Sequence, residues 1–78
     1  MNIKNSNHPV DIRILQIIES RGLKQRSVAE RAGDKVQTLS DMINGRRLIK
    51  PYDIVKLAQV LNVSPNEFFK NPNNQKPA

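Results

Sequence analysis

Two short apolar stripes, separated by Gly33, lie between Gln25 and Asn44. The first stripe has residues at i, i+1 and i+4, which are Val28, Ala29 and Ala32. The second has residues at i, i+3 and i+4, which are Leu39, Met42 and Ile43. Each spacing places its side chains on one face of an α-helix, and glycine ends a helix at little cost because it accepts left-handed backbone. Helices this short are unstable alone, so the segment predicts two helices packed across a tight turn.

This arrangement resembles the DNA-binding helix-turn-helix of the phage repressor and Cro family, also called the XRE family. With Gln25 at the first place of that motif, the fourth, fifth, ninth, fifteenth and eighteenth places have matching residues, which are Val28, Ala29, Gly33, Leu39 and Met42. The tenth place is usually apolar and the next is usually a small hydroxyl residue, but this chain has Asp34 and Lys35 there. We therefore expect either a looser turn than usual or a second helix that Asp34 itself caps.

The resemblance covers Ile14 to Phe69 and implies an all-α fold, a compact five-helix domain similar to that of lambda repressor. Apolar spacing and helix-end signals predict helices at about 9–21, 24–32, 35–44 and 51–62. The sequence Ser64-Pro65-Asn66-Glu67 has the pattern of a capping box, which predicts a short fifth helix. We divide the chain into a flexible N-terminus at 1–8 with little to bury, a helix-turn-helix domain at 9–69 and a flexible tail at 70–78.

Helical periodicity also predicts which side chains are buried. The first helix is expected to bury Ile14, Ile17 and Ile18 and to expose Arg13, Gln16, Glu19 and Ser20. The fourth is expected to bury Ile54, Val55, Leu57, Ala58 and Leu61. Phe68 and Phe69 are adjacent, so we expect one to close the core and the other to be exposed for a partner; the alternative is that both are shared within the core of one protomer.

Charge is concentrated around the expected helix pair. The chain has a net charge of +6, and the 30 residues from Arg21 to Lys50 contain eight basic and three acidic side chains, a local excess of 8 − 3 = +5. Such an excess favours a nucleic acid or another anionic partner. The alternative is ordinary solvated surface charge, and the helix pair argues more strongly for nucleic acid than the charge does.

Other function classes have little support in this sequence. The chain has no cysteine, which is consistent with a reducing cytoplasm, and it has no apolar run of the length that a membrane span needs. Its single histidine, His8, is expected at the surface, and no nucleophile–base group or glycine-rich phosphate loop is present. We expect a cytoplasmic binding protein that is not an enzyme and has no metal, cofactor, membrane partner or small-molecule substrate.

The helix expected at 35–44 is the candidate for reading DNA bases, because its polar face can enter a major groove. The candidate base-reading residues are Val36, Gln37, Thr38, Ser40 and Asp41. Gln37 ranks first, because the resemblance places it where family members contact a base and an amide can bond adenine at two atoms. Asp41 ranks last, since a carboxylate repels phosphate; it either accepts from a cytosine amino group or pairs with a nearby arginine.

Phosphate contacts are expected on both sides of that helix. The resemblance implies that Gln25 bridges a phosphate and the reading helix, and that the basic loop after Asn44-Gly45 lies on the DNA backbone. The full set of candidate phosphate-binding residues is Lys24, Gln25, Arg26, Lys35, Asn44, Arg46, Arg47 and Lys50. Such contacts provide affinity and register without sequence information.

We therefore predict a sequence-specific regulator of transcription, a repressor in the first instance, which acts by occupying operator sites in double-stranded DNA. Repressors of this family commonly pair through the C-terminal helix, so Phe68 and Phe69 are the candidate residues of a homodimer interface. The alternative is an antitoxin-type protein-interaction module in which DNA binding serves only autoregulation.

Overall fold

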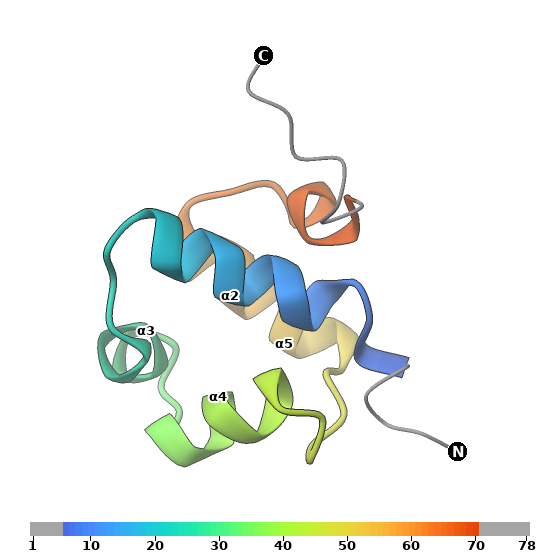
Figure 1. Ribbon diagram of the computed structural model, residues 1–78. Helices are drawn as coiled ribbons and strands as arrows, with labels where there is room; N and C mark the ends of the chain where they lie inside the picture. The colour runs from blue at the N-terminus through green and yellow to red at the C-terminus, as the bar shows by residue number, and fades with distance from the viewer. Residues whose placement is uncertain (1–5, 71–78) are drawn as a thin grey trace.

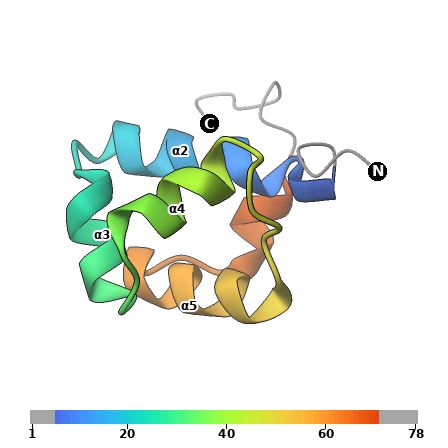
Figure 2. The same ribbon diagram turned by 90° about the horizontal axis from the view of Figure 1, so that it is seen from below.

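The computed structural model describes residues 6–70, whose regular elements are all helical (Figure 1). In chain order they are α2 (Val10–Ser20), α3 (Gln25–Arg31), α4 (Val36–Ile43), α5 (Pro51–Leu61) and the 3-10 helix η1 (Pro65–Phe69). α2 and α5 lie on opposite sides of the core, α3 closes one end and η1 closes the other (Figure 2). α4 lies across the remaining side. The predicted all-α fold is therefore confirmed.

The prediction of five α-helices was wrong, because the structure has four between Pro9 and Lys70 and a 3-10 helix after Ser64. The expected capping box does not form: Ser64 Oγ accepts from Asn66 N at 3.3 Å. Glu67 N bonds instead to the Ser64 carbonyl at 2.9 Å, which is the i to i−3 pattern of a 3-10 turn. The Glu67 side chain turns away from this helix start and pairs with Lys70 at 2.9 Å.

Apolar side chains from every helix meet in one core. Its buried members are Val10, Ile14, Ile17, Ile18, Val28, Ala29, Leu39, Met42, Ile43, Ile49, Leu57, Ala58, Leu61 and Phe68. Both stripes of the 25–44 segment are represented, which explains how such short helices are stable. Phe68 is wholly buried and contributes roughly 1.5–3 kcal/mol, while Phe69 is 55% exposed. The prediction that only one of the two rings is buried is confirmed.

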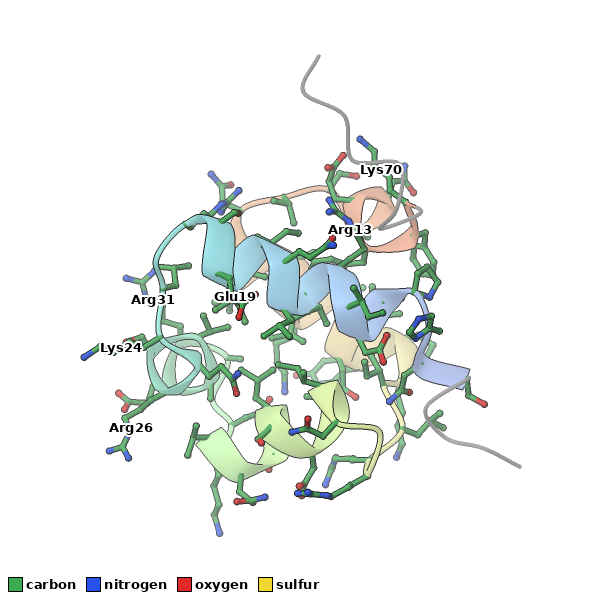
Figure 3. The ribbon with its side chains drawn as sticks, in the orientation of Figure 1. Arg13, Glu19, Lys24, Arg26, Arg31 and Lys70 are labelled. Atoms are coloured by element: carbon green, nitrogen blue, oxygen red, sulfur yellow. The ribbon has the colours of Figure 1, made fainter. Side chains whose placement is uncertain are left out.

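Two burial predictions for side chains in the helices were wrong. Arg13 was expected in solvent but is only 4% exposed, because it lies where α2 faces η1 (Figure 3). Its Nε donates to the Glu67 carbonyl at 2.9 Å and its Nη1 donates to Gln16 Oε1 at 2.9 Å. Val55 was expected in the core but is 49% exposed. A 3.6-residue period gives the apolar side of α5 but not the width of the surface that its neighbours cover.

The chain before α2 also differs from the prediction. Residues 1–8 were expected to have little to bury, yet Asn7 is 1% exposed and its side chain hydrogen-bonds to the backbone at Met42, Arg47 and Ile49. That expectation was therefore wrong at Asn7. Residues 1–5 and the predicted tail from residue 71 onward lie outside the described residues. The flexibility assigned to both ends stays a prediction.

Glycines at positive φ set the ends of α3 and α4. Gly33 has φ +76° and Gly45 has φ +79°. After α3, Asp34 N bonds to the Ala29 carbonyl at 2.9 Å, and after α4 Arg46 N bonds to the Asp41 carbonyl at 2.8 Å. These i to i−5 bonds are those of a Schellman motif, which needs a left-handed residue next to the helix end. None of the helices in the described part of the chain has the length and apolar character of a membrane span.

Candidate nucleic-acid interface

The turn between α3 and α4 determines where α4 begins. α4 begins at Val36, with Lys35 as its extended N-cap and no side-chain hydrogen bond to the cap. Asp34 does not cap the helix, so the second of the two alternatives expected for this turn was wrong. Its carboxylate instead pairs with Lys56 Nζ on α5, at 2.9 Å from Oδ2 and 3.0 Å from Oδ1. A polar residue is tolerated at this usually apolar place because α5 provides a cation for it.

The outer face of α4 is open to solvent to different degrees along its length: Gln37 and Asn44 are exposed, and Ser40 and Asp41 are partly exposed. Leu39, Met42 and Ile43 point into the core. Residues on the opposite side follow the i, i+3, i+4 and i+7 spacing of one helix face, and they are Gln37, Ser40, Asp41 and Asn44. Figure 2 shows α4 lying across the front of the molecule on this side. Four polar side chains are therefore presented together on one convex surface.

Hydrogen bonds along this face organise its side chains. Gln37 Nε2 donates to Asp41 Oδ1 at 2.8 Å, and Arg46 Nη1 lies 3.6 Å from the same oxygen. Asn44 Nδ2 donates to the Ser40 carbonyl at 2.9 Å and to Ser40 Oγ at 3.2 Å. The pairing of Asp41 with an arginine is the second of the two roles predicted for it. The contact makes Asp41 the link between the polar face of α4 and the loop that follows.

The other two candidate base-reading residues are less central. Val36 is 38% exposed at the first turn of α4. Thr38 is partly buried and lies at the edge of the polar face, about 100° around the helix from Gln37. The structure therefore brings four of the five candidates onto or beside one surface, with Thr38 at its margin.

Six exposed cations lie at the start of α3, just before α4 and in the loop after α4. They are Lys24, Arg26, Lys35, Arg46, Arg47 and Lys50. Arg46 has its contact with Asp41, and the other five make no ion pair within residues 6–70. In Figure 3, Lys24 and Arg26 extend away from the helical body around α3, and Arg31, which the sequence reasoning did not assign, extends on the same side. Positive charge is thus available at both ends of α4.

Gln25 and Asn44 complete the predicted phosphate set. Gln25 is the first residue of α3 and is half-buried. Asn44 is the exposed C-cap of α4, and its amide is already bonded to Ser40. The free backbone N–H groups at the start of α3 and the partial positive charge there suit an anion beside Gln25.

Sequence reasoning missed Asn7, which contacts the loop at 45–50 from inside the molecule. Its Nδ2 donates to the Met42 carbonyl at 3.1 Å and to the Arg47 carbonyl at 2.9 Å. Its Oδ1 accepts from Ile49 N at 2.8 Å. An asparagine in a polar stretch carries no sequence signal for such a role, because its partners lie 35 to 42 residues further along the chain.

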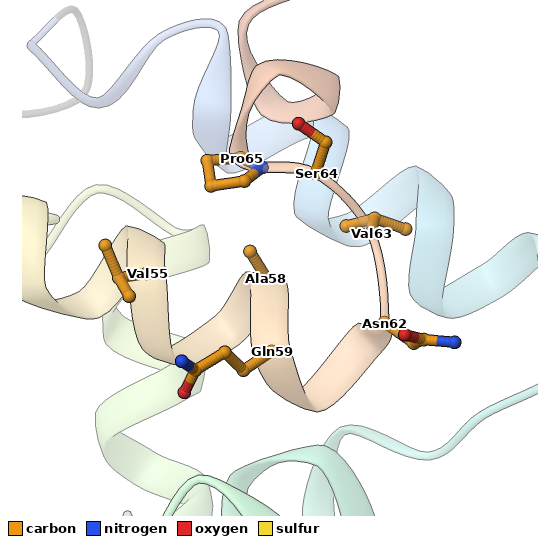
Figure 4. Close-up of a pocket in the computed structure, with 7 residues that line it drawn as sticks. All are labelled: Val55, Ala58, Gln59, Asn62, Val63, Ser64 and Pro65. Atoms are coloured by element: carbon orange, nitrogen blue, oxygen red, sulfur yellow. The ribbon is translucent and has the colours of Figure 1, made fainter.

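A pocket of about 470 Å³ lies between α5 and the segment that leads into η1 (Figure 4). It is lined by Val55, Ala58 and Gln59 of α5 and by residues 62–65. None of these side chains is charged, so the pocket offers neither a general acid or base nor an ionic contact for a ligand.

Comparisons with known proteins agree with this geometry. A helix-turn-helix family model matches residues 14–68. The structure is similar to the crystal structure of the restriction-modification controller protein C.AhdI from Aeromonas hydrophila, with a TM-score of 0.73 and 27% sequence identity over 77% of this chain and 91% of that chain. No curated protein sequence matches the chain.

Proposed function

The chain belongs to the XRE family of helix-turn-helix DNA-binding regulators, and we propose that it represses transcription by occupying operator sites in double-stranded DNA as a homodimer. The observation that carries this proposal is the exposed polar face of α4, which is backed by buried Leu39 and Met42 and surrounded by cations. Similarity to a controller protein supports a regulatory role over a catalytic one.

Base reading is assigned to the outer side of α4 in the major groove. Gln37 is central on that face. Its amide has one donor group and one acceptor, which match the N7 acceptor and the N6 amino donor of adenine. Ser40 and Asp41 flank it one turn away, and Val36 is available for a thymine methyl group. Only side chains on this face reach base edges when the helix lies between two phosphate strands.

Phosphate binding is assigned to the cations at the two ends of α4. Lys24, Arg26 and Lys35 approach one strand from the α3 side, and Arg46, Arg47 and Lys50 approach the other from the loop. Five of these have no competing ion pair in the described structure, so binding does not first require an internal contact to break. The expected consequence is strong salt dependence, because each neutralised phosphate releases counterions.

The homodimer is assigned to the surface around η1. Phe68 is committed to the core of its own protomer, so the apolar contact offered to a partner is Phe69, at 55% exposure. A two-fold pair would place two α4 helices on successive major grooves, about 34 Å apart.

The test is a selection of bound sequences from a random DNA pool, followed by native mass spectrometry of the winning complex. We expect an inverted repeat with half-site centres about one helical turn apart and two protein chains per duplex. Phe69→Ser is the matched control: it should halve the stoichiometry while the half-site is still recognised. Enrichment of no sequence, with equal binding to all duplexes, would contradict operator recognition.

A further inference from the structure

Asn7 connects the chain ahead of α2 to the last turn of α4 and to the basic loop, which we define as residues 45–50. The residue is 1% exposed, and its side chain hydrogen-bonds to backbone atoms of α4 and this loop. Nδ2 uses both hydrogens, one for the Met42 carbonyl and one for the Arg47 carbonyl. Oδ1 accepts from Ile49 N. One amide thus connects the last turn of α4 to two points of the loop.

These bonds hold a segment that has no regular structure of its own. Arg46 N and Arg47 N are tied to the Asp41 carbonyl, at 2.8 Å and 3.1 Å, which fixes the start of the loop. In the next part of the loop, the Arg47 carbonyl and the Ile49 N–H both hydrogen-bond to the Asn7 side chain. Without that amide, a partly buried carbonyl and a buried N–H would lack partners, and the backbone would have to move to find water.

The position of the loop decides where its arginines point. Arg46 and Arg47 are exposed and lie between the part of the loop fixed to Asp41 and the part fixed to Asn7. We propose that Asn7 is a positioning residue that sets the conformation of the basic loop and thereby places Arg46 and Arg47 on the DNA backbone. The DNA half of this inference rests on the proposed function; the loop half does not.

Asn7 and Arg13 form a matched pair for testing this. Both are buried polar side chains near the N-terminus of the domain that hydrogen-bond to backbone distant in sequence. Arg13 bonds to η1, on the side of the molecule away from α4 (Figure 3). Asn7→Ala and Arg13→Met therefore each remove a buried polar anchor, but only Asn7→Ala removes one from the basic loop.

The DNA experiment measures Kd against salt on a selected operator and on an unrelated duplex, at a temperature where circular dichroism shows each variant folded. Asn7→Ala should weaken binding to both duplexes alike, by at least about 5-fold, and lower the salt slope by about 0.9 to 1.8. Arg13 contacts η1, to which the homodimer is assigned, so the Arg13→Met control is measured on a duplex with a single half-site, which one protomer binds. On that duplex Arg13→Met should bind as the wild type does, whereas Asn7→Ala should still be weakened. In an Arg46→Ala/Arg47→Ala background, adding Asn7→Ala should change Kd by less than about 2-fold, because its effect passes through those arginines.

Three results would overturn the proposal: wild-type affinity in Asn7→Ala, an equal loss of half-site affinity in Arg13→Met, or a full additional loss in the double-arginine background. The last two would make Asn7 an ordinary stabilising residue.

A second readout needs no DNA. Amide hydrogen exchange by NMR should show the Ile49 N–H exchanging at least about 10-fold faster in Asn7→Ala than in the wild type. The Ile18 N–H in α2 should exchange at the same rate in Asn7→Ala as in Arg13→Met. Equal acceleration at both amides would contradict a local role. If the wild type binds no duplex, the proposed function fails, and exchange still decides the loop claim. Asn7→Ser is the substitute should Asn7→Ala not fold; unfolding of both would refute a role confined to the loop.

Discussion

The amide of Gln37 donates to the carboxylate of Asp41 one turn further along α4, with 2.8 Å between Nε2 and Oδ1. This bond uses one of the two Nε2 hydrogens, so the other hydrogen and Oε1 stay available. Adenine needs one donor and one acceptor from such an amide. Asp41 can therefore orient Gln37 for a base without itself touching DNA, and the same carboxylate oxygen lies 3.6 Å from Arg46 Nη1.

Asp41→Asn should raise affinity for every duplex, because the change removes a negative charge from the face that approaches phosphate and releases Arg46. An amide oxygen can still accept from Gln37, so the preference for the operator should be kept. The expected gain is about 0.2–1 kcal/mol, the range for an exposed ion pair. Fluorescence anisotropy on specific and unrelated duplexes measures both quantities. A selective loss on the operator would show instead that Asp41 contacts a base.

Arg46→Ala with Arg47→Ala should weaken binding to all sequences and lower the salt slope by about 0.9 for each phosphate that the variant no longer neutralises. Lys70→Ala is the control, since Lys70 is an exposed cation on the side away from α4 (Figure 3). Titrations at several salt concentrations give the slopes. If the double variant keeps the wild-type slope, the basic loop is not in the interface.

Features that depend on local spacing could be predicted from the sequence. The apolar stripes predicted the helices α2 to α5, and Gly33 predicted the turn between α3 and α4. The adjacency of Phe68 and Phe69 predicted one buried ring and one exposed ring. The polar face of α4 followed from its buried face, because each fixes the other on a helix. The antitoxin alternative is not tested by any of these features.

Features that depend on a distant partner could not be predicted. Asp34 looked like a defect in the motif until α5 placed Lys56 beside it, 22 residues later. Arg13 and Asn7 are polar in sequence, and only the packing of η1 and of the basic loop buries them. A period shows which way a side chain points, but the tertiary fold decides what covers it.

The Asp34–Lys56 pair should show a coupling of about 1 kcal/mol in a double-mutant cycle, the upper end for ion pairs with some access to water. Both side chains are 18% exposed, so either single alanine variant leaves a partly desolvated charge. Asp34→Leu with Lys56→Met should be about as stable as the wild type, since it restores an apolar residue at the family's apolar place. Urea unfolding measures all the variants; zero coupling would make the contact energetically neutral.

Glu67 should make the free energy of unfolding depend on pH in the acidic range. Its pKa lies below the ordinary value of 4.5, first because of the hydrogen bond from Lys70 and further because of the positive charges of Lys70 and Arg13. A lowered pKa means that the unfolded chain binds the proton more readily than the folded chain does. The stabilisation by Glu67 is therefore present above pH 4.5 and is lost as the pH falls through the lowered pKa of the folded state.

Glu67→Gln should therefore be less stable than the wild type at neutral pH, with a difference that shrinks as the pH falls below 4.5 and through the lowered pKa of Glu67. Lys70→Met should remove most of the same pH dependence. Thermal unfolding at a series of pH values provides the comparison. A difference between Glu67→Gln and the wild type that stayed constant with pH would mean that the carboxylate has no charge-dependent role.

The central claim is that the exposed face of α4 reads DNA sequence through Gln37. The most direct measurement is the ratio of Kd values for the selected operator and for the same operator with one contacted base pair changed, in the wild type and in Gln37→Ala. We expect Gln37→Ala to lose roughly 1–3 kcal/mol of this discrimination while keeping the wild-type salt slope. An unchanged ratio in Gln37→Ala would contradict the claim.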